Sequence, residues 1–423
     1  MMNKKTLPIL TAALVSTSVA VNAQNIKISE TAPAIQLEAL GMSGNHQYIC
    51  GLNVATYRGF IWDTENDIVA ENGGDYANCD FRGVTNEGKA YGIIGLDDMV
   101  TTNASVFGMD GAIETIEEEM SQIFAVTPDG TIAVGCLLDD MWLPTACVWK
   151  NGVRTILPCP TDEECGFMND GANAQFVSAD GKVIAGYLQD WHSARPAIIW
   201  RLQDDGTYVA DVISKDIWEL NDGEGKPYRK FEPLGISANG QWLCLAGQHE
   251  GVEGFTTPEF MIRMNLETGE IFESALPATD EFDPETEGYY PNNIANDGTC
   301  IGVLANRAGL IWRAGTDTPV LLREAFPSIE RFEEYDFYHH APIAISSDAK
   351  YIAGYALPFF EDEDGMLDYN FESYLLCIDE EAGVPSIRTH TFNNTRAYDL
   401  TGRNTPADSK GLIIKDNILK YNK

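Results

Sequence analysis

Aromatic and polar side chains alternate in the longest polar stretches of the sequence, such as LQDWHSARP (188–196) and RFEEYDFYHH (331–340). Flat rings stack on the apolar faces of sugars, and carboxylates and amides accept hydrogen bonds from sugar hydroxyls. These stretches therefore predict a carbohydrate-binding surface. Its candidate residues are Trp142, Trp191, His192, Arg195, Trp218, Tyr289, Tyr290, Tyr335 and Tyr338. The alternative is that long loops bury their own rings and turn their acids toward water.

One acidic stretch has the composition of a cation site. EDEDGMLDYNFE, from Glu361, contains Asp362, Asp364 and Asp368, and clustered carboxylate oxygens are the ligands that calcium prefers. The stretch lacks the full helix-loop-helix calcium pattern, so calcium is a candidate cofactor without a complete motif. A transition metal is the other candidate ion, with ligands from His192, His249, His339 and His340.

Carboxylates could also serve catalysis. Two carboxylates in one cleft can act as acid and nucleophile in glycoside hydrolysis. The sequence contains no nucleophile elbow, no phosphate-binding loop and no convincing catalytic triad. No catalytic residue is therefore assigned, and binding is favoured over an enzyme. The carboxylates that a hydrolase could use include Asp139, Asp140, Asp190 and Glu285.

Charge and composition limit the classes of partner. The 423 residues carry a formal net charge of −36, so the phosphates of a nucleic acid would be repelled. A hydrophobic fraction of 44% is enough for a packed core, which makes the acidity a property of the surface. Cations, cationic surfaces and neutral polar ligands remain open as partners, and the oligomeric state is left open.

The amino-terminal residues predict export. Lys4 and Lys5 precede an apolar run, 7–21, that ends in VNAQ, which is the pattern of a signal peptide cleaved after Ala23. No later run reaches the roughly 18 apolar residues of a membrane helix. We expect a protein that is secreted or displayed on the outer cell surface, without a transmembrane span.

The cysteines fit an exported chain only in part. There are nine, an odd number, so at least one thiol is not in an intramolecular disulfide. Most lie in short apolar runs, where cysteine behaves as a buried hydrophobic residue. Cys159 and Cys165 are the best candidates for a disulfide, and Cys136 with Cys147 are weaker ones.

One short motif organises the chain. Ser/Thr-x-Asp/Asn-Gly, or a degraded version of it, recurs at intervals of 42 to 59 residues between short apolar runs. The hydroxyl and the Asp or Asn stabilise a tight turn, and Gly accepts its positive φ, so each copy predicts a β-hairpin. The seven copies begin at Ser43, Thr85, Thr127, Ser178, Ser237, Ala295 and Ser346.

The repeats must position the candidate residues. A four-stranded unit of about 50 residues cannot bury both faces alone, so we predict an all-β, seven-bladed β-propeller of four-stranded antiparallel blades. An open stack of sheets would leave two apolar end faces exposed. Trp62, Trp149, Trp200 and Trp312 share one position in the third strand and are expected to fill the space between blades.

Strand alternation also predicts two different faces. The turns between first and second strands are short, whereas the long connections emerge on the opposite face, where the candidate ligand residues would gather. Closure of the last blade has two candidates, NIKIS from Asn25 and SIRTHTF from Ser386.

Two resemblances accompany these patterns. The units, best seen at 127–130 and 178–181, resemble the HAF-type extracellular repeat and, more distantly, the repeats of TolB-like propellers. This resemblance implies a binding propeller. The tail from Arg396 resembles the C-terminal sorting module of type IX secretion in Bacteroidetes proteins, but has DNILK (416–420) where that module has GKK. Such a module implies delivery to the cell surface, and a vestigial appendage or a docking strand are the alternatives.

The expected organisation is therefore a signal peptide at 1–23, a propeller at 24–392 and a short β-rich C-terminal appendage at 393–423. The expected function is recognition of a glycan or an envelope protein through the long-loop face. A carbohydrate-active enzyme, either a glycoside hydrolase or a lyase, and a structural scaffold in an envelope complex are the alternatives.

Overall fold

A computed structural model gives the architecture of the chain. The described residues are 26–28, 36–74, 76, 78–96, 101–117, 120–189, 195–213, 230–249, 259–277, 279, 283, 287–361, 367–378, 397–399, 404–405, 411–415 and 418–422. They divide into two units, one within 1–378 and one within 379–423.

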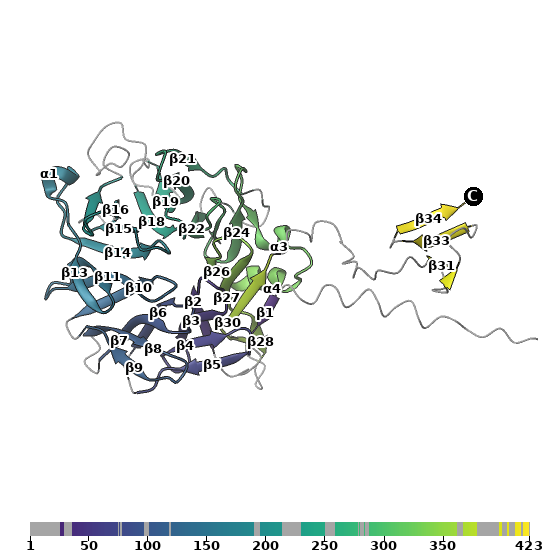
Figure 1. The fold of residues 1–423 in the computed structure, drawn as a ribbon, viewed down its shortest axis with the longest axis horizontal. Helices are drawn as coiled ribbons and strands as arrows, with labels where there is room; N and C mark the ends of the chain where they lie inside the picture. The colour runs from purple at the N-terminus through teal and green to yellow at the C-terminus, as the bar shows by residue number, and fades with distance from the viewer. Residues whose placement is uncertain are drawn as a thin grey trace, which may run out of the picture. The chain divides into compact units, whose positions relative to one another are not determined.

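The first unit is a ring of seven four-stranded antiparallel sheets, which confirms the predicted propeller (Figure 1). In the first six blades the strand order follows the sequence from the axis outward. Blades 1 to 3 contain β2 (Leu37–Met42), β3 (Tyr48–Asn53), β4 (Arg58–Asp63), β5 (Ile68–Glu71), β6 (Asn78–Val84), β7 (Ala90–Gly95), β8 (Thr102–Phe107), β9 (Ile113–Thr115), β10 (Ser121–Val126), β11 (Ile132–Leu138), β12 (Pro144–Lys150) and β13 (Val153–Ile156).

The next three blades follow the same plan. They contain β14 (Ala172–Val177), β15 (Val183–Leu188), β16 (Ala197–Leu202), β17 (Tyr208–Asp211), β18 (Lys230–Ile236), β19 (Trp242–Gln248), β20 (Phe260–Asn265), β21 (Ile271–Glu273), β22 (Tyr289–Ile294), β23 (Cys300–Leu304), β24 (Ala308–Trp312) and β25 (Val320–Leu321).

The seventh blade joins the two ends of the ring. It contains β26 (His340–Ile345), β27 (Tyr351–Ala356) and β30 (Glu372–Cys377), and its outer strand is β1 (Ile26–Ile28). Ile26 pairs with Leu376 and Ile28 with Tyr374 in antiparallel register. Of the two candidates for closure, the amino-terminal one is therefore adopted, while Ser386 lies outside the described residues.

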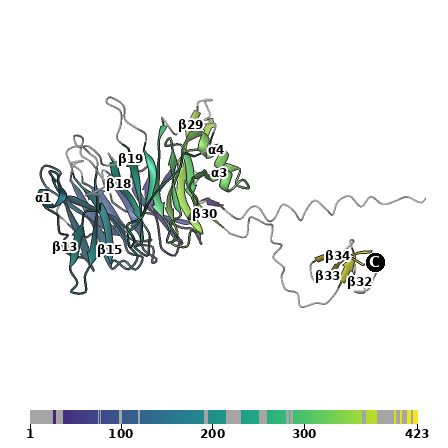
Figure 2. The ribbon, with the colours of Figure 1, turned by 90° about the horizontal axis from the view of Figure 1, so that it is seen from above.

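The connections differ between the two faces. Figure 2 views the ring edge-on, with α3 (Leu322–Ala325), α4 (Arg331–Tyr338) and β29 (Leu367–Tyr369) together on one side. The same long-loop face carries α1 (Asp162–Cys165) in the connection between blades 3 and 4. None of the helices in the described residues has the length and hydrophobicity needed to span a bilayer.

The repeated motif forms the predicted turns on the other face. Thr127 Oγ1 donates to Asp129 Oδ1 at 2.6 Å, and the same hydroxyl accepts from the backbone N–H of Ile132. Gly130 supplies a φ of 74°. In the degraded copy, Ala349 stands in place of glycine and takes a φ of 59°. An L-residue adopts this φ at some cost, but the turn is retained.

The core lies between the blades. Trp62, Trp149, Trp200 and Trp312 are all fully buried, which confirms their predicted packing role. Trp200 Nε1 donates to the carbonyl of Pro158, so even the polar edge of this ring is satisfied inside the protein.

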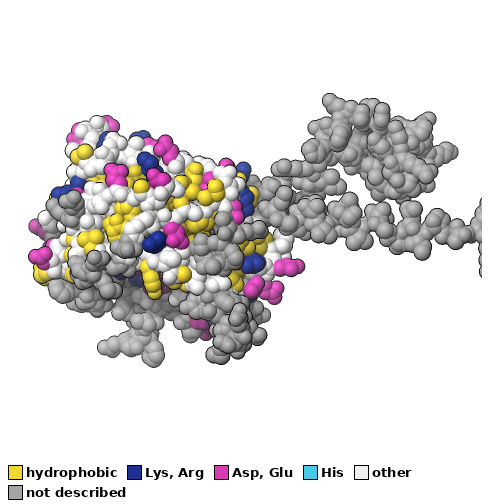
Figure 3. All heavy atoms as spheres, turned by 90° about the horizontal axis from the view of Figure 1, so that it is seen from below, with side chains coloured by type: hydrophobic (Ala, Val, Ile, Leu, Met, Phe, Trp, Pro, Cys, Tyr) yellow, Lys and Arg dark blue, Asp and Glu magenta, His cyan; other side chains and the backbone are white. Residues whose placement is uncertain are grey.

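The side of the ring seen in Figure 3 is a mixture of apolar and charged side chains. Figure 3 views the side of the ring that carries β5 and β9 and shows hydrophobic side chains among charged ones. Ile68 of β5 is 53% exposed, as expected for an outer strand with solvent on one side.

The predicted disulfide between Cys159 and Cys165 is absent from this part of the structure. Cys165 is buried in the hydrophobic cluster with Leu157 and Phe167. The exposed Cys159 instead accepts a hydrogen bond from Asn169 Nδ2 at 3.2 Å. Cys136 and Cys147 are likewise not joined: Cys136 pairs with Ala146 and Cys147 with Gly135, so the two side chains point to opposite faces of the sheet.

The second unit is a small antiparallel sheet. It contains β31 (Ala397–Asp399), β32 (Asn404–Thr405), β33 (Gly411–Lys415) and β34 (Ile418–Asn422), in the order β32-β31-β33-β34. The appendage is thus β-rich, as predicted from the tail.

Candidate functional site

Each of the seven inner strands contains one register shift, which marks a β-bulge. A bulge re-aims the extra side chain. All seven extra residues line one central cavity of about 710 Å³, a volume typical of ligand pockets. They are Leu40, Arg82, Phe124, Gln175, Leu234, Asn292 and Ile343.

Above the bulges, toward the long-loop face, the inner strands carry polar residues. We call the positions two residues before each bulge the polar layer, and six of its seven members are polar. Gln122, Asn173 and Glu232 of this layer line the cavity directly. The layer consists of Glu38, Asp80, Gln122, Asn173, Glu232, Tyr290 and Ala341.

Below the bulges, toward the short turns, the same strands are apolar. We call the positions two residues after each bulge the apolar layer. All seven members are hydrophobic, so the cavity changes from polar to apolar along the axis. The layer consists of Met42, Val84, Val126, Val177, Ile236, Ile294 and Ile345, of which the first five line the cavity.

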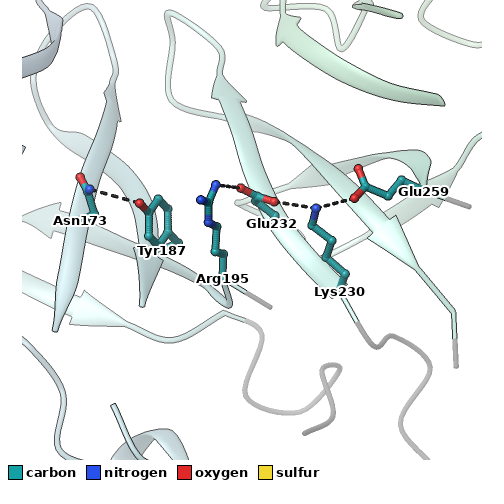
Figure 4. Close-up of polar contacts among 6 residues, drawn as sticks. All are labelled: Asn173, Tyr187, Arg195, Lys230, Glu232 and Glu259. Carbon is teal, nitrogen blue, oxygen red and sulfur yellow. Dashed lines mark hydrogen bonds and ion pairs between the residues drawn. The ribbon is translucent and has the colours of Figure 1, made fainter. Parts of the chain in front are cut away.

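A chain of polar contacts crosses blades 4 and 5 at the mouth (Figure 4). Arg195, which follows β15, places Nη1 2.7 Å from Oε1 of Glu232, and its guanidinium lies 5.1 Å from the ring centre of Tyr187. Lys230 Nζ contacts Oε2 of Glu232 at 2.8 Å and Oε1 of Glu259 at 2.6 Å. Two cations and two carboxylates therefore hold one another in place.

Burial and pairing set the electrostatics of this chain. Burial lowers the pKa of Lys230, but the hydrogen bonds to Glu232 and Glu259 outweigh it and raise the pKa above its ordinary value. Burial raises the pKa of the Tyr187 hydroxyl, which stays protonated and can donate at neutral pH. Both groups are therefore protonated at neutral pH.

Asn173 is the most informative residue of the polar layer. Its side-chain amide donates to the Tyr187 hydroxyl at 3.3 Å, and the residue is only 5% exposed. Its Oδ1 is buried and has no hydrogen-bond partner among the described residues. A buried acceptor without a partner costs about 1–3 kcal/mol, which a ligand donor would offset.

Blades 1 and 2 supply the other side of the mouth. Arg82 donates from Nε to Oδ1 of Asp80 at 2.9 Å and from Nη2 to Oδ2 at 2.8 Å. Its guanidinium lies 5.9 Å from the ring centre of Phe124. Burial raises the pKa of Glu38, which also shares a hydrogen bond with Tyr355.

Two of the nine predicted ligand residues lie at this mouth. Arg195 lines the cavity, and Tyr290 belongs to the polar layer, with its hydroxyl donating to Asn306. Trp142 is 48% exposed in the turn between β11 and β12, away from the cavity lining. Trp191, His192 and Trp218 lie outside the described residues, and the side chain of Tyr338 is also not described.

Two predicted ligand residues are instead part of the core. Tyr289 is 2% exposed and Tyr335 is fully buried, so neither ring offers a face to a ligand at the surface. Tyr289 alternates with Tyr290 along β22 and therefore points to the other side of the sheet. Tyr335 of α4 packs against Phe332, and its hydroxyl donates to Glu372.

No group of three or more His, Cys, Asp or Glu side chains suited to a metal occurs in the described residues. Asp368 lies in β29, paired with Phe360 of β28 (Phe359–Glu361), while Asp362 and Asp364 lie outside the described residues. His340 is buried, with Nδ1 hydrogen-bonded to Asp336 at 2.9 Å and Nε2 to the Tyr374 hydroxyl at 2.7 Å.

Two of the four carboxylates named for hydrolysis, Asp139 and Asp140, are described, and both lie in the turn between β11 and β12. Asp139 accepts from the backbone N–H groups of Met141 and Leu143, so it shapes a turn. Asp140 is exposed on the same turn. Asp190 and Glu285 lie outside the described residues.

Sequence reasoning missed most of the cavity residues, although the repeat contained a signal for them. Every bulge lies three residues before the first residue of the turn motif, as Gln175 does before Ser178. Every polar-layer residue lies five residues before it, and every apolar-layer residue one residue before it. Aligning the seven copies on the turn would have collected the layers.

Comparison with known proteins gives a likeness in fold alone. No protein-family description matches the chain, and no curated protein sequence matches it, so the HAF-type and type IX resemblances stay predictions. TolB from Acinetobacter baumannii is 15% identical over 56% of this chain and 53% of its own length, with a TM-score of 0.37. Kuenenia stuttgartiensis hydrazine synthase is 14% identical over 80% and 97%, with a TM-score of 0.46. The Cps50 (Swd1) propeller of Myceliophteria thermophila is 11% identical over 83% and 99%, with a TM-score of 0.45.

Proposed function

We propose that this chain is an exported β-propeller that binds a glycan at the polar mouth of its central cavity. The observation that carries the proposal is Asn173, a residue of the cavity lining whose Oδ1 is buried and has no hydrogen-bond partner among the described residues. A sugar hydroxyl donates and accepts at once, so it could satisfy this oxygen while accepting from a neighbour.

The surroundings of Asn173 support a neutral polar ligand. The amides of Gln122, Gln175 and Asn292 also line the cavity. The charged groups at the mouth are paired, with Arg82 on Asp80 and Arg195 on Glu232, which leaves little net charge to attract an ion. Amides, hydroxyls and oriented ion pairs are the groups that recognise sugar hydroxyls.

Binding is tested first with a glycan array and then by calorimetry on the sugars that give a signal. Asn173→Leu should weaken binding about tenfold, because one ligand hydrogen bond is lost. Asn103→Leu is the matched control: Asn103 is also buried with a partnerless Oδ1 among the described residues, but it does not line the cavity. An array without signal above a charge-matched acidic protein, or equal losses in both variants, would contradict the proposal.

A glycoside hydrolase is the second candidate, and Glu38 is the observation that favours it. Burial raises the pKa of Glu38, which is the property of a general acid, and Asp80 of the neighbouring blade is a second carboxyl group. Release of reducing sugars from a glycan panel, abolished by Glu38→Gln, would establish hydrolysis. Binding without release would leave the chain a binding protein.

A further inference from the structure

We propose that the ligand of the cavity is amphipathic: a glycoside whose sugar lies in the polar layer and whose apolar aglycone lies against the apolar layer. The inference rests on the proposed function, because the sugar part uses the same mouth. It adds a second chemical group to the ligand and assigns a site for that group.

The first step is the state of the apolar layer. Met42, Val126 and Val177 line the cavity and stay partly exposed, although they lie inside the ring. In blades 6 and 7 the equivalent residues Ile294 and Ile345 are buried in the packing between blades. Val84 and Ile236 of blades 2 and 5 line the cavity but are also buried, so the apolar layer presents unfilled hydrophobic surface on the side of blades 1, 3 and 4.

The second step concerns the bulge layer, which is the set of seven extra residues of the β-bulges. It lies between the polar layer and the apolar layer and contains residues of both kinds. Arg82, Gln175 and Asn292 are its polar members, in blades 2, 4 and 6, and Asn292 Nδ2 donates to the carbonyl of Pro342 at 2.8 Å. The remaining four members, Leu40, Phe124, Leu234 and Ile343, are apolar and alternate with them around the ring. A ligand that crosses this layer must leave most of its polar groups above it.

The third step is the length of the cavity. Four residues of extended strand separate the polar layer from the apolar layer, which corresponds to roughly 10–13 Å along the axis. One sugar ring at the mouth is too short to reach the apolar layer. A sugar with an alkyl or aryl substituent spans both, and the cavity of about 710 Å³ is large enough for a ligand of that kind.

The test measures affinity against the length of the apolar part. The probes are methyl, butyl, hexyl and octyl β-glycosides of glucose, galactose and mannose, titrated by calorimetry below their micelle-forming concentrations. Burial of each methylene should tighten binding about threefold to fourfold for the sugar that is recognised. Affinity that does not rise from methyl to hexyl, or no binding by any alkyl glycoside, would overturn the inference.

Two variants separate the parts of the site. Met42→Gln keeps the approximate shape of the side chain but makes it polar, so it should flatten the dependence of affinity on alkyl chain length. Met168→Gln, at a surface residue that is 62% exposed, is the control and should change nothing. Asn173→Leu should weaken every member of the series by the same factor. If Met42→Gln left the slope unchanged, the alkyl chain would not be in this cavity.

The outcome also distinguishes the two proposals. A positive glycan array with no gain from alkyl chains would retain glycan binding and remove the amphipathic ligand. If no glycan and no alkyl glycoside bound, both glycan binding and the amphipathic ligand would be contradicted. If 1-hexanol bound as tightly as the hexyl glycosides, the cavity would bind the alkyl chain without recognising the sugar. That result would contradict both proposals.

Discussion

At the scale of the residue, one inserted position in each inner strand decides which side chain enters the cavity. Gln175 and Arg82 reach the axis because a bulge turns them inward, and neither belongs to a conspicuous motif. Tyr289 and Tyr290 show the converse, that conspicuous residues need not lie in the site. The pair is conspicuous in sequence, yet alternation buries the first and leaves the second at the mouth. Residue type alone therefore could not identify the site.

Glu232 is the residue on which the mouth depends most. Its side chain is 9% exposed and is the common partner of Arg195 and Lys230. Glu232→Gln should lower the free energy of unfolding by about 1–2 kcal/mol, because two cations lose a buried counter-charge while the shape is kept. Urea unfolding measures the change. Glu267→Gln, at an exposed acceptor of Gln241, should cost less than half as much, and an equal cost would mean that the network contributes nothing.

At the scale of the element, most of the fold could be predicted from short patterns. The turn motif predicted the hairpins because Thr127 and Asp129 stabilise their own turn, independently of the rest of the chain. For the closing strand the sequence offered two candidates and could not choose between them, because Ile26 and Ile28 form β1 only by pairing with residues about 350 positions away. The bulges also could not be predicted from local sequence, since a bulge is a property of two paired strands.

The closing strand should matter for stability beyond its three residues. Ile26 and Ile28 pack against the hydrophobic cluster of blades 6 and 7. The double variant Ile26→Asp, Ile28→Asp should lower the free energy of unfolding by roughly 2–4 kcal/mol, because two half-buried side chains are exchanged for charges. Chemical denaturation of the full chain measures the loss.

An outer strand elsewhere in the ring supplies the control for β1. Val153 and Ile156 of β13 are 69% and 59% exposed, so replacing both with Asp should have a small effect. A loss as large as that of the β1 variant would indicate that any charge on an outer strand is harmful. The effect would then not depend on ring closure.

At the scale of the whole molecule, neighbouring turns join to form the short-turn face. The backbone N–H of Asn86 donates to the carbonyl of Pro128, and that of Ala179 to the carbonyl of Ala238, so adjacent blades are linked at their ends. Closure of the ring could be predicted from the seven repeats, because each four-stranded unit needs a neighbour on both faces to bury its apolar side chains. The layers of the cavity needed the ring and the bulges together, which is why they became visible only in three dimensions.

The turn carboxylates should make the ring sensitive to acid. The hydrogen bond from Thr127 is the main cause that lowers the pKa of Asp129 below its ordinary value of 3.8. Burial works against the same shift at Asp180 and Asp348, but hydrogen bonds outweigh it and lower the pKa of each. A carboxyl with a lowered folded pKa stabilises the protein fully above its ordinary pKa, and this contribution is lost as the pH falls through the folded pKa.

Replacing the three carboxylates by amides tests whether they stabilise the fold at neutral pH and lose this effect in acid. The triple variant D129N, D180N, D348N should be less stable than the wild type at pH 7, and the difference should vanish as the pH falls below the folded pKa values, which lie under 3.8. Asn239 already forms the same turn with an amide, accepting from Ser237 Oγ at 2.7 Å, so the geometry should persist. The reciprocal variant Asn239→Asp should add an acid-sensitive contribution. Urea unfolding at a series of pH values would contradict the argument if the difference between wild type and triple variant stayed constant from pH 7 to pH 2.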